Sequence, residues 1–384
     1  MYADRIKSLP PYLFAEIDGI KRKARERGVD VIDLSVGDPD IPTPEHIVRE
    51  MCEAVKRPAN HQYPSYEGKI EFREAVAEWY RDLFGVDLDP STEILTLIGS
   101  KEGLAHAPLA FVNPGDRVLV PDPAYTVYGT AVMFAGGIPE SMPLLKKNSF
   151  LPDIRSIRAR LEQDPNWRPR LIFLNYPNNP TGAVAGLDFF RELVDLAREY
   201  GILVMHDNPY SEIYFDGRPP SILQVPGAKD VAVEFHSLSK TYNMTGWRIG
   251  MVSGSSRIIE GIGRVKSNID SGNFGAVQDA GIAALRSPPE IVDGLRSVYR
   301  ERIGILYSAL CDIGLELSKP NATFYLWAWT GGDSREYAKM LLERTGIVVT
   351  PGVGFGEHGE GYIRLSVTQP TERIEMAAER LRNL

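Results

Sequence analysis

Short apolar runs alternate with longer segments that carry apolar residues on one helical face between residues 94 and 253. The short runs are rich in Val, Ile, Leu and Phe on both faces, which is typical of strands covered by helices on both sides. They predict strands at 94–98, 117–120, 171–175, 202–206, 231–236 and 248–252. The segments between them predict helices at 101–111, 125–134 and 187–200, the last of which ends at Gly201. Such an alternation predicts an α/β fold with a mainly parallel central sheet.

The pattern changes towards the end of the chain, where it is typical of a small α+β domain. We predict helices at 288–313, 334–345 and 371–384 and strands at 315–317, 323–329, 347–349 and 362–367. A helix at 15–27 and a strand at 31–36 have too few apolar residues for a core of their own, so we expect them to complete this domain or to clasp a partner subunit. The predicted organisation is an arm and first part of the small domain (1–43), a large domain (44–285) and the remainder of the small domain (286–384).

Composition and charge narrow the classes of function. The chain has 384 residues with 43 Lys and Arg against 51 Asp and Glu, a formal charge of −8, which argues against a nucleic-acid-binding surface. The N-terminus lacks a basic segment followed by an apolar one, and no apolar run approaches the ~18 residues that cross a bilayer, so we expect a cytoplasmic protein with no membrane partner. Cys52 and Cys311 form no CxxC pair and are expected to be buried free thiols, and no metal is expected.

The densest group of chemically active residues lies at 236–250. Lys240 follows a predicted strand among the hydroxyls of Ser237 and Ser239, and Arg248 comes eight residues later. A lysine is nucleophilic only when neutral, and burial beside other cations lowers its pKa towards that state. The hydroxyls and the arginine would suit a bound phosphate. A lysine in an isolated Ser-x-Ser-Lys would more simply be a solvated loop residue.

Three further segments follow predicted strands. Asn179 lies in Asn-Asn-Pro-Thr-Gly, a tight turn; Asp207, in His-Asp-Asn-Pro-Tyr, could also cap a helix. Ser100 and Lys101, in Gly-Ser-Lys-Glu-Gly, begin a predicted helix, and free N–H groups there are suited to a phosphate, although capping alone would also explain the serine. Because open α/β sheets bind ligands at the carboxyl ends of their strands, we expect these segments to meet.

Taken together and in this order, the four segments resemble the signature of class I and II aminotransferases, which are fold-type I enzymes dependent on pyridoxal 5′-phosphate. The resemblance covers essentially the whole chain. It implies that Lys240 holds the cofactor and moves the substrate's α-proton, and that Asp207 pairs with the ring nitrogen. Asn179 and Tyr210 would bind the phenolic oxygen. The cofactor-binding set implied by the resemblance comprises Ser100, Lys101, Tyr125, Asn179, Asp207, Tyr210, Ser237, Ser239, Lys240, Arg248 and Tyr63.

The same resemblance assigns roles outside these segments. Tyr125 would stack on the cofactor ring, and Tyr63 would reach the cofactor phosphate of a neighbouring subunit, which implies a homodimer with shared active sites. Gly37 would line the substrate site. Arg364 would bind the α-carboxylate, for which a planar guanidinium is better suited than a lysine. The implied reaction is ping-pong transamination between an amino acid and a 2-oxo acid.

Within the family, segments 99–103, 176–182 and 237–250 most resemble the LL-diaminopimelate aminotransferases. This implies LL-2,6-diaminopimelate as amino donor, 2-oxoglutarate as acceptor, and a place in lysine biosynthesis. Lys101 and Asn179 would contact this substrate, and Tyr12 of the arm would close over it. Plant-type members bind the distal amine through a glutamate at the position of Tyr66, beside which Glu67 stands here.

Alternatives remain open at this point. An aspartate, alanine or aromatic aminotransferase would carry the same cofactor residues. A C–S β-lyase or an α-decarboxylase would also carry these cofactor residues, because the shape of the pocket decides which bond at the α-carbon is broken. A non-catalytic regulator built on this fold usually carries a fused DNA-binding domain, for which the first 30 residues leave no room.

Overall fold

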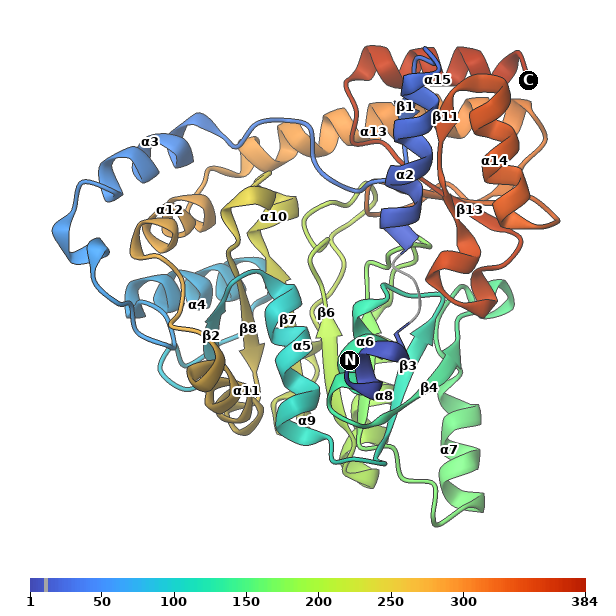
Figure 1. The fold of residues 1–384 in the computed structure, drawn as a ribbon. Helices are drawn as coiled ribbons and strands as arrows, with labels where there is room; N and C mark the ends of the chain where they lie inside the picture. Colours follow the sequence, from blue (N-terminus) through green and yellow to red (C-terminus); the bar gives the residue numbers. More distant parts are fainter. Residues whose placement is uncertain (10–12) are drawn as a thin grey trace.

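The largest sheet in the computed structural model, which describes residues 1–9 and 13–384, has seven strands in the order β2-β8-β7-β6-β5-β3-β4 (Figure 1). The strands are β2 (Ile94–Leu97), β3 (Arg117–Asp122), β4 (Ile138–Pro143), β5 (Leu171–Asn175), β6 (Leu203–Asp207), β7 (Ala232–Ser237) and β8 (Gly250–Gly254). Neighbouring strands are parallel except at β8, which runs antiparallel to both β2 and β7. The predicted α/β fold with a mainly parallel sheet is confirmed.

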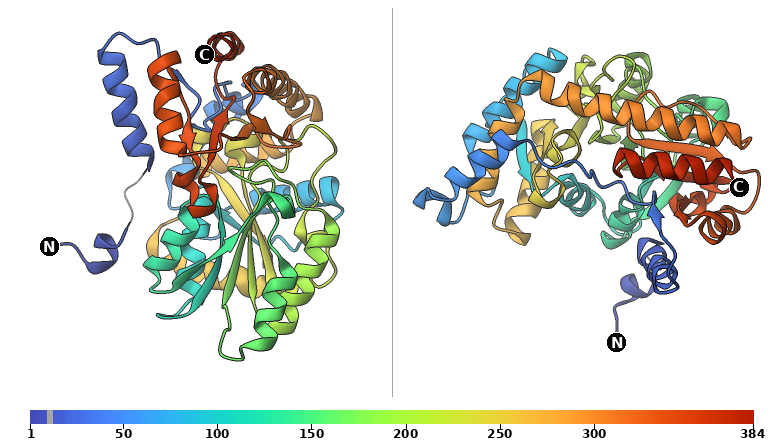
Figure 2. Two further views of the ribbon diagram at one scale, coloured as in Figure 1. Left: turned by 90° about the vertical axis from the view of Figure 1, so that its right-hand side faces the viewer. Right: turned by 90° about the horizontal axis from the view of Figure 1, so that it is seen from above.

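Helices cover both faces of this sheet, as the apolar strands require. Along β5, Leu171 and Phe173 pack against one helical layer, and Ile172 and Leu174 against the other. The first layer consists of α5 (Ser100–Phe111), α6 (Val127–Phe134) and α11 (Ser256–Ile269). The second consists of α4 (Ile70–Phe84), α7 (Ile154–Gln163), α8 (Leu187–Tyr200) and α12 (Gly275–Leu285), with α3 (Glu45–Ala54) packed on α12. The sheet is seen between the two layers in the left view of Figure 2.

A second hydrophobic core is assembled from both ends of the chain. Its four-stranded sheet has the order β12-β13-β10-β9 and consists of β12 (Thr350–Pro351), β13 (Tyr362–Ser366), β10 (Tyr325–Trp329) and β9 (Glu316–Leu317). Its helices are α13 (Pro289–Asp312), α14 (Ser334–Thr345) and α15 (Thr371–Arg382), and α13 and α15 lie side by side (Figure 2).

The N-terminal segment joins this second core. Strand β1 (Ile32–Asp33) pairs in parallel with β11 (Ile347–Val348), and α2 (Leu13–Glu26) lies beside α14 (Figure 1). These two elements of the first forty residues therefore pack with the C-terminal part of the chain. The structure also contains three short α-helices, which are α1 (Asp4–Lys7), α9 (Ala228–Val231) and α10 (Leu238–Thr241).

The structure corrects two of the sequence-based expectations. Cys52 and Cys311 are free, as predicted, but both are exposed rather than buried, because each lies on the solvent side of an amphipathic helix. The predicted strand at 248–252 begins at Gly250 instead, since Arg248 adopts a left-handed φ of 55° just before it. Because β8 is antiparallel, its first residue lies at the carboxyl edge of β7, and Arg248 reaches the same edge as Lys240. Within the described residues, no helix is long and apolar enough to cross a membrane.

Candidate active site

A cavity of about 490 Å³ lies at the carboxyl edge of the seven-stranded sheet, where residues of both cores meet. The predicted site residues that line it are Gly37, Ser100, Lys101, Tyr125, Asn179, Asp207, Tyr210, Ser237, Ser239, Lys240, Arg248 and Arg364. Tyr63 does not line the cavity, and its side chain is 90% exposed. Tyr12 lies outside the described residues. Tyr66 and Glu67 lie along a different hollow of the surface.

Lys240 projects into this cavity from α10, the short helix that follows β7. Ser237 caps the start of this helix, and its hydroxyl accepts the backbone N–H of Ser239. The Lys240 Nζ donates to the carbonyl oxygen of Gly37 over 2.8 Å. Burial lowers the pKa of Lys240 to about 8, the charges of Arg364 and Arg248 act in the same direction, and Asp38 opposes them. About a tenth of the amine is therefore neutral at pH 7, far more than for an ordinary lysine.

Asp207 is the last residue of β6 and is 4% exposed. Its Oδ2 accepts the hydroxyl of Tyr128 at 2.7 Å, whereas its buried Oδ1 has no hydrogen-bond partner among the described residues. Burial raises the pKa of Asp207 to about 7, and the bond from Tyr128 acts in the opposite direction. A buried acceptor without a donor is costly, so this oxygen is prepared for a donor that enters the cavity.

Asn179 is held in the turn that follows β5. The Asn175 Oδ1 accepts the backbone N–H of Asn179 at 2.7 Å, while the Asn175 amide donates to the carbonyl oxygen of Asp207 at 2.8 Å. The turn itself is closed by Asn178, whose Oδ1 accepts both the N–H and the hydroxyl of Thr181. The two strand ends that carry Asn179 and Asp207 are thus tied together.

Arg364 enters the cavity from β13 of the smaller sheet and is 2% exposed. Its Nη1 donates to Asn179 Oδ1 at 2.7 Å and its Nη2 to the carbonyl oxygen of Ser35 at 2.5 Å. The guanidinium lies between the rings of Tyr325 and Phe355, with its carbon 4.4 and 4.7 Å from their centres. A planar guanidinium held at the cavity wall suits a carboxylate that enters the cavity.

A second cationic region of the cavity surrounds Arg248. Gly99, with a φ of 78°, turns the chain into α5, where Ser100 is the first helical residue. The guanidinium of Arg248 lies against this turn and donates to the carbonyl oxygens of Thr245 and Ile98 at 2.9 and 3.4 Å. The hydroxyl of Ser239 is buried and has no hydrogen-bond partner among the described residues. Helix N–H groups, a hydroxyl and an arginine form a typical anion site.

Sequence reasoning missed two tyrosines of the cavity. Tyr128 lies three residues after Tyr125, so the helical spacing could have placed it next to the same ligand. The hydroxyl of Tyr325, on β10, lies 3.0 Å from that of Tyr210. No local sequence motif indicates that Tyr325 lies in the cavity. These two side chains fix Asp207 and Tyr210, respectively, in the orientation that the cavity shows.

The model of class I and II aminotransferases matches residues 29–381. The chain belongs to this family. This aminotransferase is 59% identical over 386 residues to the LL-diaminopimelate aminotransferase of Aquifex aeolicus (strain VF5), with 100% of this chain and 99% of that relative covered. A structure described as a probable N-succinyldiaminopimelate aminotransferase from Thermus thermophilus is 42% identical, with a TM-score of 0.89 over 97% of this chain and 99% of the other. A single mutant of Thermus thermophilus aspartate aminotransferase is 30% identical, with a TM-score of 0.93 over 100% and 99%.

The aminotransferase acts with pyridoxal 5′-phosphate, and the cavity fits this cofactor. The unmatched Oδ1 of Asp207 suits the protonated nitrogen of a pyridine ring. The unmatched hydroxyl of Ser239 lies in the anion site with Arg248 and suits the phosphate. The amine of Lys240, with its lowered pKa, suits the aldehyde.

Proposed function

We propose that the aminotransferase moves an α-amino group between LL-2,6-diaminopimelate and 2-oxoglutarate by a ping-pong mechanism, as a cytoplasmic enzyme of lysine biosynthesis. The observation that carries the reaction type is the placement of Lys240, an amine with lowered pKa, in one cavity with Asp207 and Arg364. The choice of donor is supported by the name of the Aquifex aeolicus relative, which matches essentially over its full length.

Each of these residues has a separate task in the proposed reaction. The cofactor, when bound, withdraws electrons from the α-carbon of the amino acid. Asp207 accepts the ring N–H and keeps the ring protonated. Asn179 and Tyr210 hold the phenolic oxygen of the ring. Arg364 would bind the α-carboxylate of the amino acid. The amine of Lys240 would remove the proton from the α-carbon and deliver it to the C4′ atom of the cofactor.

The anion site is proposed to hold the cofactor phosphate, and Tyr125 to lie on the ring. Ser100, Ser237, Ser239 and Arg248 all line the cavity. Binding of a dianion here is favoured by the first N–H groups of α5 and by the arginine.

The distal end of the substrate needs its own contacts, because diaminopimelate carries an ammonium and a carboxylate at both ends. Lys101 lies at the cavity wall with its Nζ 5.7 Å from the centre of the Tyr125 ring and is proposed to bind the distal carboxylate. Gly37 lines the same cavity. Tyr12 remains a predicted substrate contact.

The aminotransferase is further proposed to be a homodimer in which Tyr63 reaches the phosphate of the partner. A tyrosine that is 90% exposed in the single chain supports this, since an aromatic side chain gains from burial in an interface. No nucleic acid or membrane is proposed as a partner.

A half-reaction with single amino donors tests the proposal. The holoenzyme is mixed with LL-2,6-diaminopimelate, glutamate, alanine or aspartate without an oxo acid, and the visible absorbance of the cofactor is followed. We expect diaminopimelate and glutamate to convert it to the amine form. In Lys240→Ala the conversion should slow by at least about a thousandfold, whereas Lys56→Ala, a change at an exposed lysine, should leave it unaltered.

Two outcomes would overturn the proposal in different ways. Conversion by the other donors without any response to diaminopimelate would remove this substrate and leave another aminotransferase. An S-substituted cysteine, which carries a sulfur leaving group on its β-carbon, serves as a fifth donor, and release of ammonia and pyruvate from it without conversion of the cofactor would instead indicate a β-lyase.

A further inference from the structure

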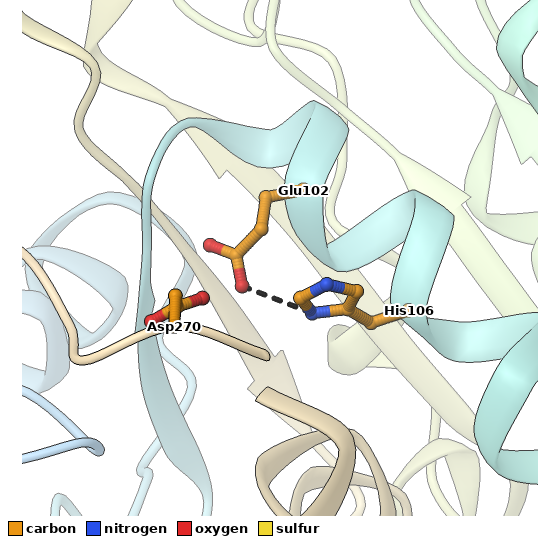
Figure 3. A group of neighbouring side chains, drawn as sticks. All are labelled: Glu102, His106 and Asp270. Atoms are coloured by element: carbon orange, nitrogen blue, oxygen red, sulfur yellow. Dashed lines mark ion pairs between the residues drawn. The ribbon is translucent and has the colours of Figure 1, made fainter. Parts of the chain in front are cut away.

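A partly buried group of charged side chains lies beside the turn that leads into α5. Glu102 is in the first turn of α5, and Lys266 and Asp270 lie one turn apart at the end of α11. The Lys266 Nζ is 3.2 Å from both oxygens of Glu102 and 2.9 and 3.1 Å from those of Asp270, and Lys266 has no exposed surface. His106 Nδ1 lies 3.1 Å from Glu102 Oε1. Figure 3 marks this ion pair with a dashed line. We call Glu102, His106, Lys266 and Asp270 the α5–α11 cluster.

Three members of this cluster have the donor atoms of a metal site. One oxygen or nitrogen of each of Glu102, His106 and Asp270 lies within 4.8 Å of the others. However, Lys266 already contacts all four carboxylate oxygens with its ammonium group. Since this group supplies the positive charge that a cation would bring, the cluster is an ion pair and not an open set of ligands.

The cluster is bonded to the backbone on both sides of the anion site. Glu102 Oε2 accepts the N–H of Ile98 at 2.6 Å and so closes the turn that leads to Ser100. Asp270 Oδ1 accepts the N–H of Gly272 at 2.7 Å. This places the next residue, Asn273, whose amide donates to the carbonyl oxygens of Leu97 and Arg248 at 3.1 and 2.9 Å.

None of the four side chains lines the cavity, so any effect on the reaction must pass through the backbone groups they hold. We propose that Glu102, Lys266 and Asp270 are positioning residues that fix the phosphate-binding turn and Arg248 relative to each other. This inference rests on the proposed placement of the cofactor phosphate. The ion pair is suited to the task because it fixes three elements at once: the start of α5, the end of α11 and the 270–273 loop.

If these residues position the phosphate site, their loss should weaken binding of the phosphate-bearing cofactor more than binding of a ligand without a phosphate. A merely structural role would weaken both equally. Pyridoxal carries the ring and aldehyde of the cofactor but no phosphate. In Glu102→Ala the turn loses its hold on Ile98, so the dissociation constant of pyridoxal 5′-phosphate should rise at least about tenfold while that of pyridoxal stays within about twofold. Both constants are measured by absorbance on the full-length enzyme after removal and return of the cofactor, and the ³¹P resonance of the reloaded enzyme should shift.

Two milder variants keep the test decisive if Glu102→Ala does not fold. Glu102→Gln retains an acceptor for Ile98 but loses the ion pair, and Asp270→Asn does the same for Gly272. Each should weaken binding of pyridoxal 5′-phosphate about three- to tenfold without weakening that of pyridoxal. The matched control is Glu199→Ala, which breaks an exposed ion pair at the end of α8, at the opposite edge of the sheet, and should change neither constant.

Arg248→Gln separates this inference from the proposed function. If Arg248→Gln weakens pyridoxal 5′-phosphate selectively and the Glu102 and Asp270 variants do not, the positioning role is wrong and the phosphate site stands. If Arg248→Gln also leaves the preference for the phosphate intact, the proposed phosphate site is wrong. Equal losses for both ligands in the Glu102 variants would likewise overturn the positioning role.

Discussion

Asp207 combines two properties at a single residue: a buried carboxylate and an oxygen without a donor. Burial raises its pKa to about 7, and Tyr128 supplies the only hydrogen bond to the carboxylate within the described residues. A ligand N–H at Oδ1 stabilises the charged form, so the cofactor and the carboxylate favour each other's ionised states. The cofactor-free enzyme lacks this stabilisation.

We predict a specific pH dependence for the stability of the enzyme stripped of its cofactor. The folded pKa of Asp207 is raised above the unfolded value of 3.8, so between these two pKa values the folded form binds more protons than the unfolded form. Its contribution to stability is therefore present below pH 4, declines as pH rises towards 7 and is lost above it. Over about three units this amounts to at most ~4 kcal/mol, and Asp207→Asn should lack the decline.

Urea unfolding of the stripped wild type and of Asp207→Asn at pH 5 and pH 8 measures this difference. The variant should gain stability relative to the wild type as pH rises. With cofactor bound, the wild type should instead be the more stable protein at pH 8, because the asparagine no longer holds the ring nitrogen as an ionic partner. Parallel pH profiles in the stripped proteins would contradict the assigned pKa shift.

That residues in ordered sequence motifs would meet in one cavity could be expected from the sequence, whereas the positions of residues that depend on tertiary contacts could not. Lys240, Asp207, Asn179 and Arg248 stand in segments with recognisable order, and all four meet at one edge of the sheet. Tyr325 could not be predicted in the same way, because its position depends on how β10 of the smaller sheet is placed against the larger one.

At the scale of elements, long apolar strands were predictable and edge elements were not. Strand β4 was missed because its sequence, Ile-Pro-Glu-Ser-Met-Pro, is largely solvent-facing at the end of the sheet, where proline is tolerated. The antiparallel direction of β8 was also missed, since alternation of apolar and polar positions carries no information about strand direction. That direction nevertheless decides where Arg248 lies.

Gly37, in the loop after β1, is closely packed against Tyr325 of β10. A Cβ added at Gly37 would overlap the hydroxyl of Tyr325, which contacts Tyr210 at 3.0 Å. Gly37→Ala should therefore displace Tyr325 or the loop that accepts the Lys240 amine. We expect kcat/KM to fall at least about a hundredfold and the free energy of unfolding by about 1–3 kcal/mol.

The double variant Gly37→Ala, Tyr325→Phe should recover part of the lost activity, because it removes the atom with the closest overlap. Gly304→Ala is the matched control: it lies in α13 with no atom near the added Cβ and should stabilise the helix by about 0.5–1 kcal/mol. Steady-state kinetics and urea unfolding check both expectations. Near-normal kinetics in Gly37→Ala would show that the loop adapts freely.

At the scale of the whole molecule, net charge and local charge have opposite signs. The chain carries a formal charge of −8, yet Lys101, Arg248 and Arg364 all line one cavity with Lys240. The global value describes the surface that faces solvent, whereas the cavity is set by a few cations gathered from distant parts of the sequence. The division of the chain at residues 43 and 285 stays a prediction.

The proposed homodimer makes a prediction about mixed assemblies. If each cavity takes Tyr63 from the partner, a dimer of one Lys240→Ala chain and one Tyr63→Ala chain has one cavity with both defects and one with neither. After equal mixing and subunit exchange, half of the dimers are hybrids, so activity should rise to about a quarter of the wild-type value per chain, well above the mean of the two parents. The matched control mixes Lys240→Ala with Asp207→Ala, whose defects lie in the same cavity of each chain, and should show no gain. A first mixture that stays at the mean of its parents would mean that each chain completes its own active site.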